Sequence, residues 1–214
     1  MRNIILILFF LACSLPAAGA DLPPVSLAEL ASRSDAVVLA QVRDTDYLRR
    51  REIPVSGSAY LKVLIAYKLD RRQDLIEIYE RGLHERECYF PDRTVFEEGR
   101  RYLLFLRRDP EDNERFRGMS EGCALEALVD ENNRYALRYP VSGINLSDPL
   151  EGVSRPMTFS DAYAVVSEED LLPAQRDAML NAGHLRPYEA GGYIYTTGVE
   201  LTEARRLMGE ALLD

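Results

Sequence analysis

Short β-type segments separated by polar turns follow one another along the chain from residue 36 to residue 141. The first, Ala36 to Val42, is rich in apolar and β-branched residues, and the second, Ala59 to Leu69, alternates between two faces. Short runs of this kind at hairpin spacing are typical of small barrels and sandwiches. The other strand-like segments are 74–80, 102–106, 124–129 and 134–141. The sequence therefore predicts a small antiparallel barrel of five to six strands.

Three finer expectations concern the strands and their connections. The polar stretches 43–52 and 109–114 are predicted to be loops, because they offer almost no apolar side chains for a core. The stretch 130–133 is predicted to be a hairpin turn, since Asn tolerates the positive φ that such turns need. The side chains expected to face the core from the second strand are Leu61, Val63, Ile65, Tyr67 and Leu69.

Helical signals flank the predicted barrel. Ser26 and Glu29 have the spacing of a capping box, which predicts a short helix that ends near Ser34. Apolar residues recur at helical spacing from about Glu200 to the end, which predicts a last helix packed on the core. The chain is thus predicted to be α+β, with a barrel domain at 21–141, a linker or surface crossing at 142–157, and a helical C-terminal extension at 158–214.

The first 20 residues have the three-part pattern of a secretory signal peptide. Arg2 precedes an apolar run at 4–12, and small residues precede an expected cleavage site before Asp21. An uncleaved anchor is disfavoured because this run is about half of the ~20 residues that a spanning helix needs. A lipoprotein acylated at Cys13 is a second alternative. We expect a periplasmic or secreted protein with no transmembrane segment after cleavage.

The charge of the chain disfavours a nucleic-acid partner. Loss of Arg2 with the signal would change the net charge from −9 to −10, whereas proteins that neutralise phosphates are basic. Clusters of arginine at 49–51, 71–72, 100–101, 107–108 and 205–206 suggest a basic face. Acidic residues follow most of these clusters closely, so we interpret them as a solvated surface with many ion pairs.

Removal of the signal would leave two cysteines, Cys88 and Cys123. An even pair in an exported chain predicts a disulfide. The alternative is a metal site that uses His84 and Cys88. This alternative is disfavoured because the segment does not have a helical pattern and the only other histidine, His184, is a hundred residues away, whereas a structural zinc site normally needs four ligands, mostly Cys and His. No cofactor is expected.

One catalytic pattern occurs in the sequence. Residues 118–122 read G-x-S-x-G around Ser120, and Asp161 and His184 follow in the order used by α/β-hydrolases. A nucleophile elbow needs a buried strand before the serine and a helix after it. Here a charged segment precedes Ser120 and a predicted strand follows, so a serine hydrolase is a minor hypothesis. Tyr188, Tyr193 and Tyr195 could line a binding surface, although core packing is the favoured interpretation.

The order of elements resembles a known family. The features are Leu27-Ala28-Glu29-Leu30, the strand from Ser34 to Val42, the long strand from Tyr60 to Leu69, Cys88, Phe96-x-x-Gly99-x-x-Tyr102-Leu103, and Cys123. They resemble bacterial exported relatives of the netrin-like and metalloproteinase-inhibitor (TIMP) domains, over residues 27 to 129. The resemblance implies a five-stranded OB-type barrel and a disulfide that joins Cys88 to Cys123.

The resemblance does not transfer the family's inhibitory mechanism. In the inhibitors, a cysteine at the mature N-terminus binds the zinc of the protease, whereas the expected mature start here is Asp21. The leading hypothesis is therefore an exported, non-enzymatic module that acts through protein contacts, with an exported or envelope protein as its partner. The alternatives are the hydrolase of Ser120, Asp161 and His184, and a protease inhibitor of modified mechanism.

Overall fold

The computed structural model describes residues 23–51, 53–81, 88 and 95–212, and the fold over these residues is α+β. The α-helices are α1 (Leu27–Arg33), α2 (Pro173–Asn181) and α3 (Leu201–Met208). Short 3₁₀ helices are η1 (Leu150–Val153), η2 (Ala162–Ala164), η3 (Glu168–Asp170) and η4 (Gly209–Leu212). The strands are β1 (Ala36–Arg50), β2 (Ile53–Lys68), β3 (Leu75–Glu80), β4 (Arg101–Asp109), β5 (Asp112–Arg117), β6 (Ala124–Val129), β7 (Tyr135–Arg138), β8 (Arg155–Pro156), β9 (Val165–Val166), β10 (Leu185–Pro187), β11 (Tyr193–Tyr195) and β12 (Thr197–Glu200).

Nine strands form one mixed sheet in the order β1-β2-β3-β5-β4-β6-β7-β12-β8, and β10, β11 and β9 form a second sheet. β1 pairs with both β2 and β4, so each strand from β1 to β5 has two partners within this set of five. The β3–β5 pairing is parallel and joins Ile78 to Phe116. The expectation of five to six antiparallel strands is therefore wrong in the strand number and in this pairing.

Residues 36–42 of β1 and 102–106 of β4 are buried on both faces, which explains the nearly continuous apolar sequence of these two segments. Alternate residues of a strand point to opposite faces. Val37 and Leu39 belong to one core cluster, which they share with α1, α3 and β6. Val38 and Ala40 belong to a second cluster, which strands β1 to β5 surround. The two strands therefore form the wall between the two main cores.

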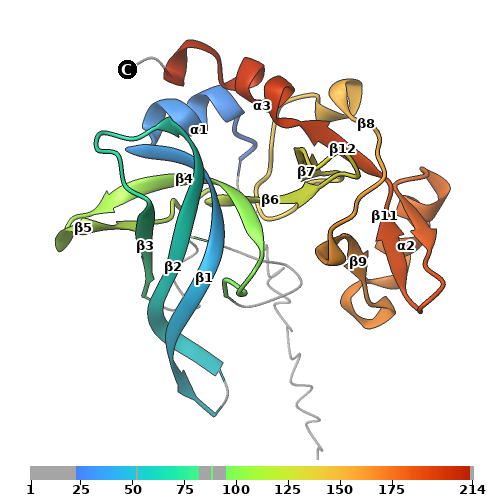
Figure 1. Ribbon diagram of the computed structural model, residues 1–214, viewed down its shortest axis with the longest axis horizontal. Coiled ribbons are helices and arrows are strands. Elements are labelled where there is room, and N and C mark those ends of the chain that lie inside the picture. The colour runs from blue at the N-terminus through green and yellow to red at the C-terminus, as the bar shows by residue number, and fades with distance from the viewer. Residues whose placement is uncertain (1–22, 52, 82–87, 89–94, 213–214) are drawn as a thin grey trace, which may run out of the picture.

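Helices α1 and α3 pack together over the first of these cores (Figure 1). The start of α1 confirms the predicted cap, because the hydroxyl of Ser26 accepts a hydrogen bond of 3.1 Å from the backbone N–H of Glu29. Leu27 and Leu30 of α1 are fully buried, and Ala204 and Met208 of α3 face them across the same core. The expected apolar stripe of the last helix is thus confirmed as a packing surface.

Two segments expected as loops belong to strands. β1 continues to Arg50 and β2 begins at Ile53, so most of the polar stretch 43–52 lies in a long hairpin. The second stretch, 109–114, contains the end of β4 and the first half of β5. The expectation failed because backbone pairing needs no apolar side chain where a strand faces water on both sides.

The predicted core face of the second strand is only partly right. Leu61 is fully buried, but Ile65 is 37% exposed. Tyr67, from the predicted core face, and Leu64, from the other face of the alternating pattern, both pack against the core beneath α1 and α3. The β1–β2 register shifts at several places, including between Leu39 and Ala40. Each such irregularity changes which side chains face a core, and the sequence alternation does not reveal it.

The segment expected as a linker, 142–157, packs against the first core. Its residues Ile144 and Leu150 are only 6% and 4% exposed. The carboxylate of Asp148 accepts a hydrogen bond of 2.6 Å from the backbone N–H of Leu27, at the start of α1. The segment is therefore tied to the N-terminal helix.

The C-terminal region, 158–214, was expected to be helical, and its described part is mixed. It contains α2 and α3, but also β9, β10, β11 and β12. β12 joins the large sheet by pairing with β7, whereas the other three form the second sheet. Leu171, Met179 and Ile194 help to form a third apolar cluster. Strands of two to four residues are too short for their alternation to be recognised in the sequence.

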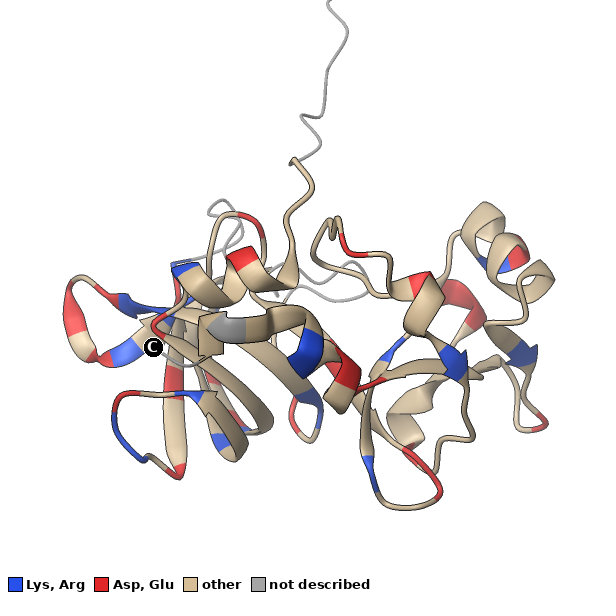
Figure 2. Ribbon diagram, turned by 90° about the horizontal axis from the view of Figure 1, so that it is seen from above, with Lys and Arg blue, Asp and Glu red and all other residues tan. Residues whose placement is uncertain are grey.

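Basic and acidic residues are interspersed over the surface (Figure 2). The predicted ion-paired surface is confirmed at Arg108, which lies 2.6 Å from the exposed Asp70, whereas Arg101 lies 2.8 Å from Asp161, whose side chain is only 6% exposed. Among the described residues, no helix is long and apolar enough to cross a membrane. The expected signal peptide at 1–20 and its alternative lipid site, Cys13, lie outside the described residues.

Candidate functional site

The outer half of the β1–β2 hairpin extends beyond the strands that flank it. β1 pairs with β4 only from Ala36 to Gln41, whereas its pairing with β2 continues as far as Arg50 opposite Ile53. Figure 1 shows this hairpin projecting from the molecule on the side opposite α1 and α3. β2 pairs with β3 only from Gly57 to Lys62, and we call the part formed by residues 43–51 and 53–56 the arm.

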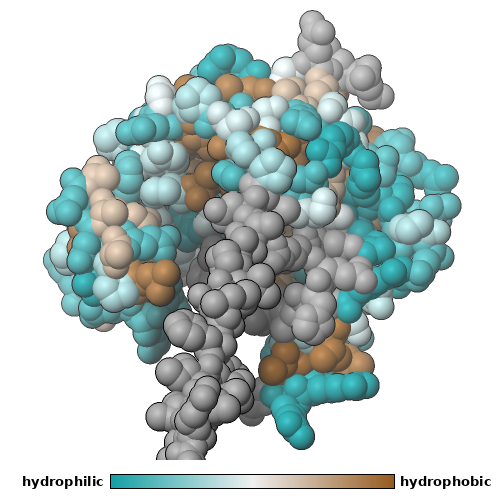
Figure 3. Space-filling model, turned by 180° about the vertical axis from the view of Figure 1, so that it is seen from behind, coloured by the Kyte–Doolittle hydropathy of each residue, from teal (hydrophilic) through white to brown (hydrophobic). Residues whose placement is uncertain are grey.

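Two large apolar side chains are exposed near the tip of the arm. Leu48 is 60% exposed and Ile53 is 53% exposed. Arg50 lies opposite Ile53 and two residues after Leu48, so these three side chains share one face of the ribbon. In Figure 3, apolar surface lies beside strongly hydrophilic surface where the hairpin projects. Neither Arg50 nor Arg51 forms an ion pair within the described part of the chain.

The opposite face of the arm is less exposed. Pro54 is buried, and Tyr47 is half-buried. The hydroxyl of Tyr47 donates a hydrogen bond to the carboxylate of Glu80 at the end of β3. Burial raises the pKa of Glu80 to about 7, and the hydrogen bond from Tyr47 opposes that rise. Burial also raises the pKa of Tyr47, so its hydroxyl remains a donor at neutral pH.

The residues of the hydrolase hypothesis have separate partners. Ser120 lies in the turn between β5 and β6, and its hydroxyl donates to the neighbouring Glu121 at 2.8 Å. Asp161 caps η2 and binds Arg101, at the start of β4. His184 lies after α2, with its Nδ1 atom 3.2 Å from Oγ1 of Thr197 and its ring edge against Tyr139.

The structure therefore does not bring these three residues together. Glu121, next to Ser120, forms an ion pair with Arg33. The backbone carbonyl of Arg33 accepts a hydrogen bond from Arg107 near the end of β4. Ser120 and Asp161 thus lie near opposite ends of β4, and six residues of strand span about 20 Å. A strand follows Ser120 where a nucleophile elbow needs a helix.

The predicted cysteine pairing is confirmed. Cys88 and Cys123 lie within disulfide distance, with their Cα atoms 5.0 Å apart. The two residues belong to the core that strands β1 to β5 surround. His84, of the alternative metal site, lies outside the described residues. Within the described residues, no three His, Cys, Asp or Glu side chains are grouped closely enough to hold a metal ion.

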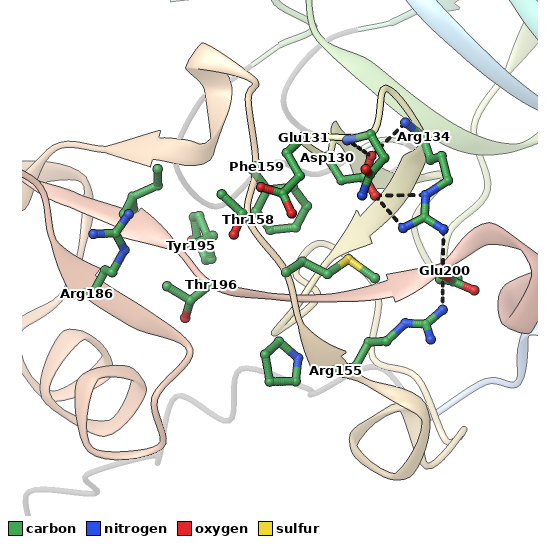
Figure 4. A pocket seen from close by; sticks show the side chains of 14 residues that line it. Asp130, Glu131, Arg134, Arg155, Thr158, Phe159, Arg186, Tyr195, Thr196 and Glu200 are labelled. Carbon is green, nitrogen blue, oxygen red and sulfur yellow. Dashed lines mark hydrogen bonds and ion pairs between the residues drawn. The ribbon is translucent and has the colours of Figure 1, made fainter.

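A pocket of about 500 Å³ lies where the second sheet meets the end of the large sheet (Figure 4). Its floor includes Phe159, Ile194 and Tyr195, which are 5%, 8% and 4% exposed. Tyr195 is one of the three tyrosines for which the sequence suggested either a binding surface or core packing. It is buried in the structure and also lines this pocket. The other lining residues are Asp130, Glu131, Asn132, Arg134, Arg155, Pro156, Met157, Thr158, Arg186, Thr196 and Glu200.

The sequence reasoning did not identify the arm or the pocket. The arm tip carries Arg49 to Arg51, which were interpreted as part of a solvated surface, and its flanking apolar residues lay in or beside a predicted loop. The pocket residues come from four separate stretches of sequence. A run of polar residues with isolated Leu and Ile was the only signal for the arm.

No protein-family model matches this chain. No curated protein matches it either.

Proposed function

We propose that this protein is an exported, non-enzymatic module that binds another protein through the tip of the β1–β2 arm. The observation that carries the proposal is the exposure of Leu48 and Ile53 beside Arg50 on a projecting hairpin. Leu75 and Leu172 are exposed to a similar or greater degree, but Leu48 and Ile53 lie together near the tip of a projecting polar hairpin. Exposed apolar groups next to cations are suited to contacts with another protein.

The partner is expected to present an apolar depression with acidic groups around it. Burial of one Leu or Ile side chain contributes about 1.5 to 3 kcal/mol to the free energy of binding. Burial of both Leu48 and Ile53 would contribute about twice as much. The unpaired guanidinium groups of Arg50 and Arg51 favour carboxylates on the facing surface. We therefore propose an acidic exported or envelope protein as the partner.

The proposed scaffold is an OB-like barrel made of β1 to β5. Two observations support it. Each of these strands has two partners within the set, and side chains from all five contribute to one apolar cluster. OB-folds are five-stranded barrels of this kind. The resemblance to netrin-like and TIMP-like domains agrees with the scaffold and remains a proposal, as does the division at 142–157.

Export is part of the proposal. It is supported by the signal-like segment 1–20 and by the pairing of Cys88 with Cys123, since disulfides persist in oxidising compartments. The periplasm or the extracellular space is therefore the proposed location.

Site-specific photo-crosslinking in the source organism tests the contact surface. A photoreactive amino acid is placed at position 48 or 53, and the control position is Leu75, an equally apolar residue that is 55% exposed on β3. Illumination should yield one defined adduct with a different, acidic protein from positions 48 and 53 and none from position 75. Arg50→Glu, combined with the probe at 48, should lower the yield at least fivefold.

Two outcomes would contradict the proposal. Equal adducts from positions 48 and 75 would indicate non-specific contact. An adduct containing only a second copy of this chain would assign the arm to self-association instead of to a partner.

A further inference from the structure

The charges around the pocket of Figure 4 fall into two groups. The first group is an ion-paired network at one end. Arg134 lies 2.9 Å from Asp130 and 3.7 Å from Glu200, and Arg155 also pairs with Glu200. Two cations and two carboxylates thus neutralise one another, and this end of the pocket carries no net charge.

The second group consists of Arg186 and Glu131. Both are exposed lining residues, and neither side chain forms a hydrogen bond or ion pair with any other described residue. Figure 4 places Arg186 at the end of the pocket away from the ion-paired network, and Glu131 beside Thr158 nearer that network. The pocket therefore presents one unpaired cation and one unpaired carboxylate at separate places on its rim.

The space between these charges has a small apolar floor among polar groups. Phe159 and Ile194 supply buried apolar surface. The hydroxyl of Thr158 has no hydrogen-bond partner among the described residues, whereas that of Thr196 donates to the carbonyl of Gly183 at 2.7 Å. The volume of about 500 Å³ lies in the range of small-molecule sites, which combine apolar floors with few orienting polar groups.

We infer that this pocket binds a small zwitterion whose two charges lie at opposite ends, a dipeptide with an apolar side chain. Arg186 binds the carboxylate of the ligand, and Glu131 binds its ammonium group. The apolar side chain of the ligand lies on Phe159 and Ile194. Charge-assisted hydrogen bonds at both ends make the site selective for a ligand that carries both charges. This site is separate from the arm, and the inference does not depend on the proposed protein contact.

Calorimetric titration of the full mature protein with glycyl-L-leucine tests the inference. N-acetyl-glycyl-L-leucine, which lacks the ammonium group, and glycyl-L-leucinamide, which lacks the carboxylate, are the matched probes. Glycyl-L-leucine should bind with a dissociation constant below about 1 mM. Each probe that lacks one charge should bind at least tenfold more weakly.

Variants assign the two ends of the site. Arg186→Gln and Glu131→Gln should each weaken binding of the zwitterion at least tenfold, and both sites are exposed, so the fold should be retained. Arg72→Gln and Glu114→Gln, at exposed positions outside the pocket, are the controls and should bind like the parent protein. The inference is overturned if glycyl-L-leucine does not bind at 10 mM, if either probe that lacks one charge binds as well as glycyl-L-leucine, or if the pocket variants behave like the controls.

Discussion

The hydroxyl of Tyr47 on β1 donates a hydrogen bond to Glu80 on β3, across the intervening strand β2. The contact is possible because Gly57 of β2 lies opposite both Tyr47 and Glu80. With no side chain at position 57, the ring of Tyr47 can cover that strand. The pair therefore joins the base of the arm to the body of the protein.

Glu80 should give the stability of the protein a distinct pH dependence. Burial raises its pKa from 4.5 to about 7. A raised carboxyl pKa contributes stability that is fully present below the unfolded value and is lost as the pH rises through the folded value. Between pH 5 and pH 8, the cost of charging Glu80 should therefore reach about 2 to 3 kcal/mol. Unfolding of the parent protein and of Glu80→Gln in urea at several pH values measures this cost.

The difference between the two proteins isolates Glu80 from the other titrating groups. Glu80→Gln should gain stability relative to the parent as the pH rises from 5 to 8. A difference that stays constant over this range would show that Glu80 does not titrate there.

Gly57→Ala should destabilise the protein by about 2 kcal/mol or more. Gly57 has a φ of +154°, and an added Cβ would collide with the backbone carbonyl oxygen of Asp46 and lie 2.6 Å from the Cα atom and 2.8 Å from the Cδ1 atom of Tyr47. The matched control is Gly152→Ala, whose added Cβ meets nothing within 4 Å. That variant should differ from the parent by less than about 0.5 kcal/mol in urea unfolding. Similar losses in both variants would contradict the crossing of Tyr47 over Gly57.

Glu126→Ala should lower the free energy of unfolding by about 3 kcal/mol or more, because it leaves two cations without their buried partner. Glu126 pairs with Arg100 and, at 3.2 Å, with Arg138, whose side chain is only 9% exposed. Glu203→Ala is the control, since its partner Arg206 is 62% exposed. The control should cost less than about 1 kcal/mol. Equal effects in thermal unfolding would argue against a buried network.

Loss of the Cys88–Cys123 pair should lower the free energy of unfolding by roughly 3 to 4 kcal/mol, because the two residues close a loop with a sequence separation of 35. The double variant Cys88→Ser/Cys123→Ser measures this loss. A reductant should destabilise the parent protein and leave the double variant unchanged. Thiol labelling of the unreduced protein should find neither Cys88 nor Cys123 free, and labelled Cys88 would contradict the pairing.

Part of the fold could be predicted because its signals are local. The cap at Ser26, the turn with Asn133 at a φ of 60°, and the apolar strands β1, β4 and β6 depend on short-range chemistry. The cysteine pairing followed from the count of cysteines and the expected compartment. In each case, a few neighbouring residues or a count of one residue type was sufficient for the prediction.

The candidate sites could not be predicted in the same way. The arm consists of polar residues held by backbone pairing, and the backbone groups are the same for every sequence. The G-x-S-x-G pattern failed because its meaning depends on a following helix, and β6 follows instead. The pocket needs Glu131 and Arg186 to lie at one cavity although they are far apart in the chain.

The sequence by itself determined which segments are apolar enough to enter a core, where the first helix begins, and which cysteines can pair. Only the tertiary structure decided which face of β2 is buried, that residues 43–51 extend as an arm, and that Ser120, Asp161 and His184 have separate partners. The physical reason is that hydrophobic burial and capping are properties of nearby residues. Strand register, bulges and the meeting of distant side chains depend instead on how all the segments pack at once.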